Sequence, residues 1–116
     1  MVYTPIEDEM VDFVVREIIK GKLKDRDKLY SLRFFTNRFK AGPAYVKRSM
    51  ARLEERRLIS LVDGEYYLSL DDKKIDALKE NQANRIINDF LDQMGQIGID
   101  TREALSYLER RSRANG

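Results

Sequence analysis

Two short helical segments joined by a tight turn constrain the fold of this chain more than any other feature. They occupy residues 31–57, SLRFFTNRFKAGPAYVKRSMARLEERR. Ser31 can cap the first segment. Gly42 and Pro43 force a turn after Lys40, because glycine takes unusual backbone angles and proline suits the first position of a helix. The residues expected on the buried faces are Leu32, Phe35, Phe39, Val46, Ser49, Met50 and Leu53.

The same stretch concentrates positive charge. Residues 31–57 carry eight basic and two acidic side chains, whereas the whole chain has a net charge of only +2. The outer face of the second segment shows Tyr45, Lys47, Arg48, Arg52 and Arg56. A local positive field attracts a polyanion, and a helix pair can deliver it to a groove. A second interpretation stays open, in which this face is only solvated and Glu54 and Glu55 pair with the arginines.

The elements on either side complete a recognisable order. Before the pair, Thr4 is placed to cap a helix that has Pro5 at its first position and ends near Gly21. Residues 22–30 are expected to form an extended connector with a short edge strand. After the pair, Asp63-Gly64 separates two apolar runs, which predicts a β-hairpin over residues 58–70. The sequence thus predicts a mainly α protein with a small hairpin, a winged helix-turn-helix over residues 1–70.

Residues 71–116 are expected to form a separate helical tail. Asp71-Asp72 opens a long helix, Gly95 and Gly98 bracket a break, and Asp100 caps a further helix. Residues 110–116 are expected to be disordered. The tail has no obvious surface of its own chain to cover, so its apolar side chains are expected to form a dimer interface. These are Ile86, Ile87, Phe90, Leu91, Met94, Leu105 and Leu108.

Several functions are disfavoured by what the sequence lacks. Without histidine or cysteine the chain has no common general base, no thiol nucleophile and no typical zinc ligands. It has no glycine-rich phosphate loop, so no cofactor and no enzyme activity are expected. It has no apolar run near the ~20 residues of a membrane span and no secretion signal, so a cytoplasmic protein without a membrane partner is expected.

Several of these motifs resemble those of GntR-family transcriptional regulators. The resemblance begins with residues 19–23, IKGKL, and 27–35, DKLYSLRFF, and continues through YVKRS at 45–49, LE at 53–54 and LI at 58–59 to Gly64. The tail, with residues 98–100 and 103–104, is similar to the two-helix tail of the YtrA-type subfamily. Members of that subfamily dimerise through this tail and lack a large effector domain. In this family Arg33 corresponds to an arginine that contacts bases or phosphates.

The chain also departs from the family pattern. Tyr30, Arg26 and Arg57 stand where the family usually has proline, glycine and glycine. Pro43 stands where the family often has an arginine at the start of the recognition helix. The resemblance therefore implies the fold more strongly than it implies the base contacts.

The resulting expectation is a homodimeric, sequence-specific transcriptional regulator, in the simplest case a repressor, on a palindromic site in double-stranded DNA. The expected DNA contacts are Ser31, Arg33, Lys40, Gly42, Ala44, Tyr45, Lys47, Arg48, Arg52 and Gly64. A small-molecule effector would have to sit between the winged domain and the tail or in the dimer seam. Two rivals stay open: a winged helix that serves as a protein-interaction or assembly module, and a replication or plasmid-partition accessory protein.

Overall fold

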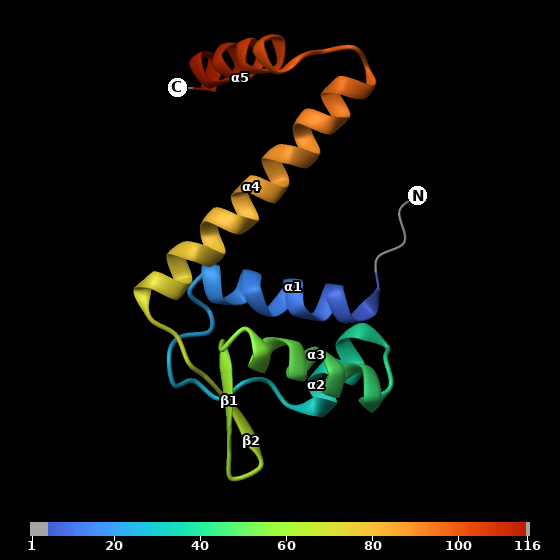
Figure 1. The fold of residues 1–116 in the computed structure, drawn as a ribbon, viewed down its shortest axis with the longest axis vertical. Helices are drawn as coiled ribbons and strands as arrows, with labels where there is room; N and C mark the ends of the chain where they lie inside the picture. Colours follow the sequence, from blue (N-terminus) through green and yellow to red (C-terminus); the bar gives the residue numbers. More distant parts are fainter. Residues whose placement is uncertain (1–4, 116) are drawn as a thin grey trace. The chain divides into compact units, whose positions relative to one another are not determined.

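The computed structural model describes residues 5–115 of the chain (Figure 1). Its helices and strands are α1 (Ile6–Ile19), α2 (Leu32–Phe39), α3 (Pro43–Glu55), β1 (Ile59–Val62), β2 (Glu65–Leu68), α4 (Asp72–Gln96) and α5 (Thr101–Asn115). This is the expected mainly helical chain with one hairpin, so the predicted fold class is confirmed. The elements fall into two compact units, one running to Leu78 and the other beginning at Lys79.

The first unit is built around the crossing of α1 with α2 and α3. Met10 and Val14 of α1 are fully buried, as is Phe35 of α2. Ser49 supplies the small side chain at the crossing, where its hydroxyl lies 3.0 Å from the carbonyl of Tyr45 and 3.5 Å from the sulfur of Met10. The core thus fixes α3 by its Val46, Ser49, Met50 and Leu53 side, leaving its opposite side in solvent.

The hairpin that follows α3 has the turn that its sequence predicts. Ile59 pairs with Leu68 and Val62 with Glu65, so Asp63 and Gly64 alone form the connection. Both turn residues have positive φ, 51° and 79°, as a two-residue turn of the type that matches strand twist requires.

The connector before α2 adds a short edge to this hairpin, as expected. Lys28 and Tyr67 form an isolated antiparallel bridge. The amide of Leu29 donates to the carbonyl of Tyr66 at 2.9 Å, and the amide of Leu68 donates to Asp27 at 2.8 Å. The wing is therefore anchored to the segment that leads directly into α2.

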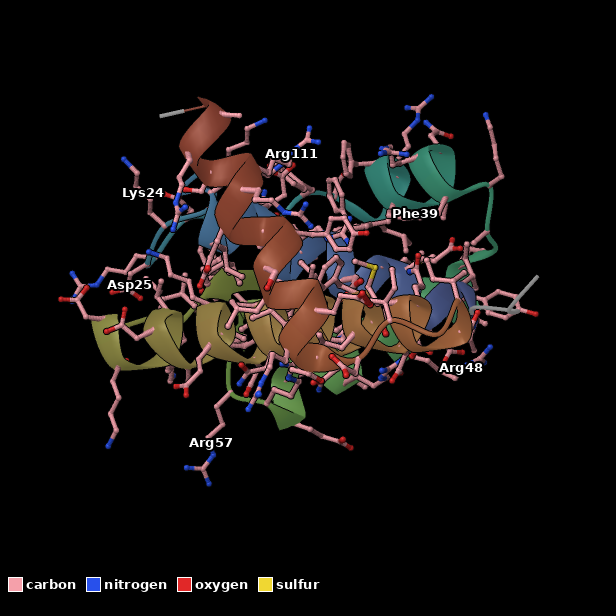
Figure 2. All side chains as sticks on the ribbon, turned by 90° about the horizontal axis from the view of Figure 1, so that it is seen from above. Lys24, Asp25, Phe39, Arg48, Arg57 and Arg111 are labelled. Atoms are coloured by element: carbon pink, nitrogen blue, oxygen red, sulfur yellow. The ribbon has the colours of Figure 1, made fainter. Side chains whose placement is uncertain are left out.

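The helices α1 and α3 each end at a residue with positive φ, which turns the chain away from the helix axis. Gly21 ends α1 with φ of 78°, as predicted, and the amide of Lys22 returns to the carbonyl of Glu17 at 2.9 Å. Arg57 does the same for α3 with φ of 60°, and there the amide of Leu58 reaches the carbonyl of Leu53 at 3.1 Å. In helix ends of this kind the left-handed residue is usually glycine. The side chain of Arg57 points away from the ribbon (Figure 2).

Three expectations for this unit are wrong or fall outside the described residues. Leu32 was expected to be buried but is 45% exposed; it lies in the first turn of α2, at the groove that Phe35 also lines. The turn between α2 and α3 places its left-handed conformation at Lys40, with φ of 54°, whereas Gly42 has an ordinary φ of −71°. Pro5 precedes the first helical residue of α1 rather than occupying it, and Thr4 lies outside the described residues.

The second unit comprises the rest of α4 together with α5. Gly98, with φ of 81°, follows the end of α4. Asp100 caps α5, since its carboxylate accepts from the amide of Glu103 at 2.9 Å. The expectation that the chain is disordered from residue 110 is wrong, because α5 continues through Asn115; Gly116 is not described.

Candidate nucleic-acid interface

The start of α2 is held by its own cap. The side chain of Ser31 accepts a hydrogen bond from the amide of Phe34 at 3.1 Å, as its position in the sequence predicts. Arg33 lies in this first turn and is exposed, and its carbonyl accepts from the hydroxyl of Thr36 at 3.1 Å. The cap therefore fixes the backbone that carries Arg33.

Removing this cap has an expected cost. Ser31→Ala should lower the free energy of unfolding by about 1 kcal/mol, because the amide of Phe34 loses its partner. The urea midpoint followed by far-UV circular dichroism measures this loss. Ser112→Ala, at an exposed position within α5, is the matched control and should leave the midpoint nearly unchanged. Equal midpoints for both variants would contradict the role of the cap.

A groove of about 560 Å³ lies between the start of α2, the adjoining side of α3 and the wing. Ser31, Lys47 and Gly64, three of the expected DNA contacts, line it together. Lys28 and Glu65 lie at the same groove and are joined by a 2.8 Å ion pair. The hydrogen bond between them raises the pKa of Lys28 and lowers the pKa of Glu65. The structure thus brings residues from three separate segments to one concave surface.

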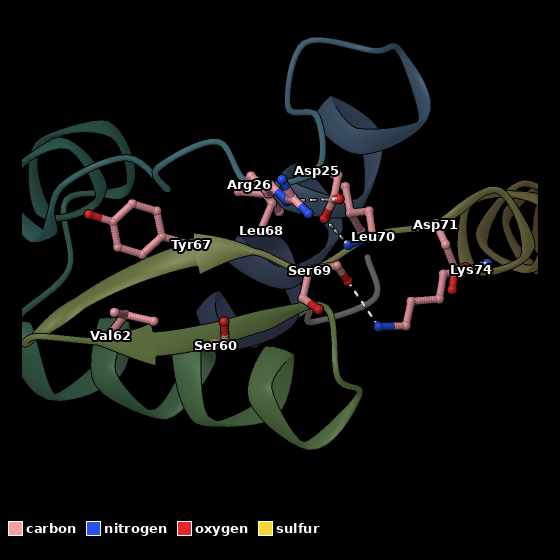
Figure 3. A pocket seen from close by; sticks show the side chains of 10 residues that line it. All are labelled: Asp25, Arg26, Ser60, Val62, Tyr67, Leu68, Ser69, Leu70, Asp71 and Lys74. Atoms are coloured by element: carbon pink, nitrogen blue, oxygen red, sulfur yellow. Dashed lines mark hydrogen bonds and ion pairs between the residues drawn. The ribbon is translucent and has the colours of Figure 1, made fainter.

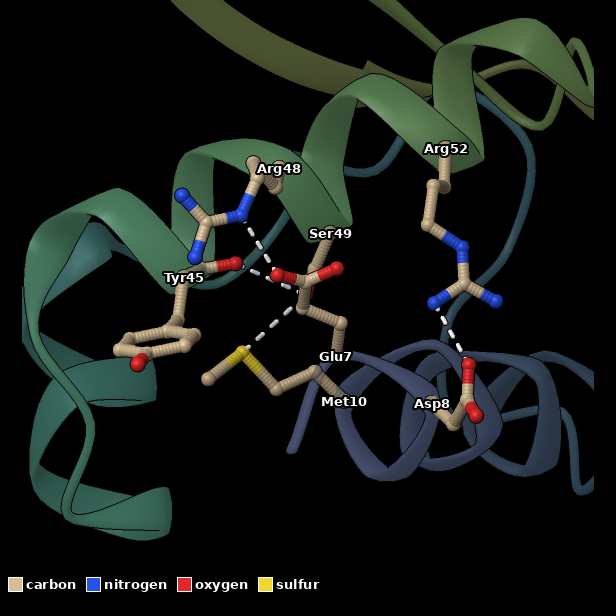
Figure 4. Close-up of polar contacts among 7 residues, drawn as sticks. All are labelled: Glu7, Asp8, Met10, Tyr45, Arg48, Ser49 and Arg52. Atoms are coloured by element: carbon tan, nitrogen blue, oxygen red, sulfur yellow. Dashed lines mark hydrogen bonds and ion pairs between the residues drawn. The ribbon is translucent and has the colours of Figure 1, made fainter. Parts of the chain in front are cut away.

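Two arginines of α3, Arg48 and Arg52, are already paired with acidic side chains of α1. Arg48 donates from its Nε to Glu7 at 2.5 Å, and Arg52 donates to Asp8 at 2.7 Å (Figure 4). The guanidinium of Arg48 also lies over the ring of Tyr45, 4.7 Å from its centroid. The hydrogen bond to Glu7 raises the pKa of Arg48 above its ordinary value.

The remaining expected contacts lie at the surface around the turn between α2 and α3. Lys40, Gly42 and Ala44 are exposed around the turn between α2 and α3. The sequence offers Glu54 and Glu55 as nearby partners for Arg52 and Arg56, whereas the structure pairs Arg48 and Arg52 with acids of α1. Glu54 instead accepts from the hydroxyl of Tyr66 at 3.2 Å, which joins α3 to the wing. In the sequence, the acidic residues 7–9 indicate the start of a helix. They do not indicate contacts with α3, because sequence spacing alone does not show which helices cross.

A second hollow of about 560 Å³ lies at the base of the hairpin (Figure 3). Its two cations are engaged within the fold. The ammonium of Lys74 donates to the carbonyls of Arg57 and Ser69 at 2.7 and 3.0 Å, and Arg26 lies 3.9 Å from Asp25. Asp25 also accepts from the amide of Leu70 at 2.8 Å. These contacts join the connector, the hairpin and the first turn of α4, so we assign this hollow a structural role.

The second unit presents a different kind of surface. Ile86, Ile87, Leu105 and Leu108 are exposed by about half, while Phe90, Leu91 and Met94 are half-buried. Two further apolar side chains, which were not among the expected interface residues, are exposed there: Ile97 at 71% and Tyr107 at 47%.

Among the described residues, no helix is both long and apolar enough to cross a membrane. The same residues contain no group of three or more acidic side chains that could hold a metal ion, and the chain has no histidine or cysteine.

Helix α1, the α2–α3 pair and the β1–β2 wing together define a winged helix-turn-helix protein. No protein-family model matches the chain. Its structure is similar to that of a GntR family transcriptional regulator from Listeria monocytogenes, with a TM-score of 0.79 and 27% identity over 95% of this chain and 97% of that one. The resemblance to GntR-family transcriptional regulators that the motifs indicated is therefore confirmed.

Two further similarities extend along nearly the whole chain. YtrA from Sulfolobus acidocaldarius, a GntR-family transcription factor, has the same fold, with a TM-score of 0.55 and 20% identity over 99% of this chain and 95% of YtrA. YhcF of Bacillus subtilis (strain 168), described as an uncharacterized HTH-type transcriptional regulator, is 22% identical over 106 residues, 90% of this chain and 88% of YhcF. These relatives are transcriptional regulators and not enzymes, in agreement with the expectation for this chain.

Proposed function

We propose that this protein is a sequence-specific DNA-binding transcriptional regulator. The observation that carries the proposal is the groove formed by the start of α2, the side of α3 that bears Lys47 and the wing tip at Gly64. In a winged helix-turn-helix, these are the elements that approach the major groove and the adjacent backbone. The transcriptional regulators that share this fold support the same conclusion.

In this proposal the cations act in two ways. Lys40 and Lys47 neutralise phosphates, which contributes affinity at every sequence. Arg33, at the capped start of α2, and the edge formed by residues 42–45 read bases. Arg48 and Arg52 contribute only when they leave their partners on α1. Residues 1–70 thus bind DNA and residues 71–116 join two protomers.

The proposed assembly is a homodimer on a palindromic operator. Apolar side chains of α4 and α5 that remain exposed in the second unit supply a surface for self-association. Two recognition helices would then meet half-sites about one helical turn, roughly 34 Å, apart. Repression by obstruction of polymerase is the simplest output of such a dimer.

Selection of bound sequences from random double-stranded DNA tests this function. Enrichment of one palindrome is expected. Retention of no DNA even at low salt would overturn the proposal and favour a protein-interaction module, a role that Pro43 in place of the family's arginine leaves open. Enriched sequences that map to repeats at replication origins would favour a replication accessory protein instead.

Arg33→Gln should weaken binding to the selected operator by about tenfold or more, because an arginine contact to a base edge contributes roughly 1–3 kcal/mol. Titration of a labelled duplex by fluorescence anisotropy measures the change. The matched control is Arg38→Gln, which removes the same charge from the same helix. The guanidinium of Arg38 instead lies over the rings of Phe13 and Phe39, at 5.5 and 5.4 Å. Similar losses for the two variants would contradict a specific role for Arg33.

A further inference from the structure

Two carboxylates on α1 form ion pairs with two arginines of α3, the helix proposed to contact DNA. Glu7 accepts from Arg48 at 2.5 Å and Asp8 accepts from Arg52 at 2.7 Å. Both acids lie in the first turn of α1, and both arginines lie on α3 (Figure 4). The two pairs both join the first turn of α1 to α3.

Each pair changes what an approaching phosphate encounters. A guanidinium bound to a carboxylate forms a unit of zero net charge, whereas a free one attracts phosphate and releases counterions when it binds. Carboxylate and phosphate oxygens compete for the same planar set of N–H donors. An arginine held by Glu7 or Asp8 therefore contributes little to loose, non-specific association.

The pairs are also exposed enough to exchange partners. The side chains of Arg48 and Arg52 are 55% and 42% exposed, so DNA phosphates can reach them. Exposed ion pairs of this kind contribute only about 0–1 kcal/mol. A phosphate or base edge held close in a well-docked complex can displace such a carboxylate, while a loosely placed phosphate cannot.

We propose that Glu7 and Asp8 are specificity-determining residues that withhold Arg48 and Arg52 from non-cognate DNA. This inference rests on the proposed DNA-binding function. The two acids compete with phosphate and lower the affinity for arbitrary sequence. On the cognate site the arginines leave α1 and bind the duplex.

The test measures binding to a labelled random-sequence duplex of roughly 30 base pairs, long enough for two half-sites about one turn apart. Glu7→Gln with Asp8→Asn should steepen the dependence of log affinity on log salt by about 1.8, because two more phosphates are neutralised at about 0.9 each. The loss of affinity between about 50 and 200 mM KCl should then grow by about tenfold. An unchanged slope, or weaker binding by the variant, would overturn the inference.

A matched control separates this mechanism from a general change of charge. Glu9→Gln alters the same helix by the same charge, two residues from Glu7. Glu9 is exposed and forms no ion pair with α3 among the described residues. It should leave the slope close to that of the wild type. A slope raised equally by Glu9→Gln and Glu7→Gln would assign the effect to the overall field and overturn the inference.

A double-mutant cycle tests the route of the effect. If Glu7 acts through Arg48, then Glu7→Gln should change nothing once Arg48→Gln is present. Persistence of the Glu7→Gln effect in that background would overturn the inference. Failure of the wild type to bind any duplex at low salt would instead refute the proposed function, so the two failures are distinguishable.

Discussion

Phe35→Ala is expected to lower the free energy of unfolding by about 3–5 kcal/mol, the range observed when a fully buried aromatic side chain is truncated. Phe35 has no exposed surface and belongs to the core where α2 meets α1 and α3. Its ring contacts that of Phe13 edge-on at 6.3 Å and that of Phe34 at 5.3 Å.

Urea unfolding followed by far-UV circular dichroism measures this loss as a fall in midpoint of at least about 1 M. The adjacent Phe34 provides the matched control, because it is the same residue type on the same helix but 36% exposed. Phe34→Ala should cost clearly less than Phe35→Ala, because Phe34 is already 36% exposed to solvent, although it loses contacts with neighbouring rings such as that of Tyr30 at 4.6 Å. Equal losses at the two positions would show that the core is not centred where the structure places it.

The sequence predicts elements well wherever one short-range rule decides the outcome. The hairpin followed from Asp63-Gly64, because both turn residues must adopt positive φ and few residue pairs do so readily. The cap at Ser31 and the buried side of α3 followed from residue type and helical period. These features depend on neighbours no more than a few residues away.

Other features depended on how helices cross, and the sequence did not predict them. Leu32 fits the apolar stripe of α2 by spacing, yet it is exposed because no element covers that side of the first turn. Lys40 adopts the left-handed conformation that was expected of Gly42, because α2 ends at Phe39 and the residue that closes it is Lys40, two positions before the glycine. A lysine in that conformation carries a backbone penalty that glycine would avoid.

The candidate site shows the same division. Its location on the α2–α3 pair and the wing was predictable from charge, turn chemistry and family motifs. The ion pairing of Arg48 and Arg52 was not predictable from the sequence. Glu7 and Asp8 are about forty positions away and meet these arginines only where α1 crosses α3. A count of basic residues therefore overstates the charge that this surface offers to a phosphate.

Replacing Ile86 and Leu108 together with aspartate is expected to convert the proposed dimer to a monomer and to weaken binding to the selected palindrome by about a hundredfold or more. These side chains are 59% and 49% exposed in the single chain. In a dimer they would be covered, and an unpaired carboxylate buried there is strongly unfavourable. The loss in DNA affinity follows because linking two half-site readers typically raises affinity by about 10² to 10⁴ without any new contact.

Sedimentation velocity over a range of protein concentrations measures the assembly, and titration of the palindromic duplex measures its consequence. Asn88→Asp with Ser112→Asp, at exposed polar positions on the same two helices, adds the same charge and should leave both measurements near the wild type. Binding to a duplex with a single half-site should be weak and similar for all three proteins, because one winged unit suffices there. A variant that is monomeric yet binds the palindrome as tightly as the wild type would show that residues 71–116 do not couple the two DNA-binding units. A wild type that is itself monomeric would remove the basis for a palindromic operator.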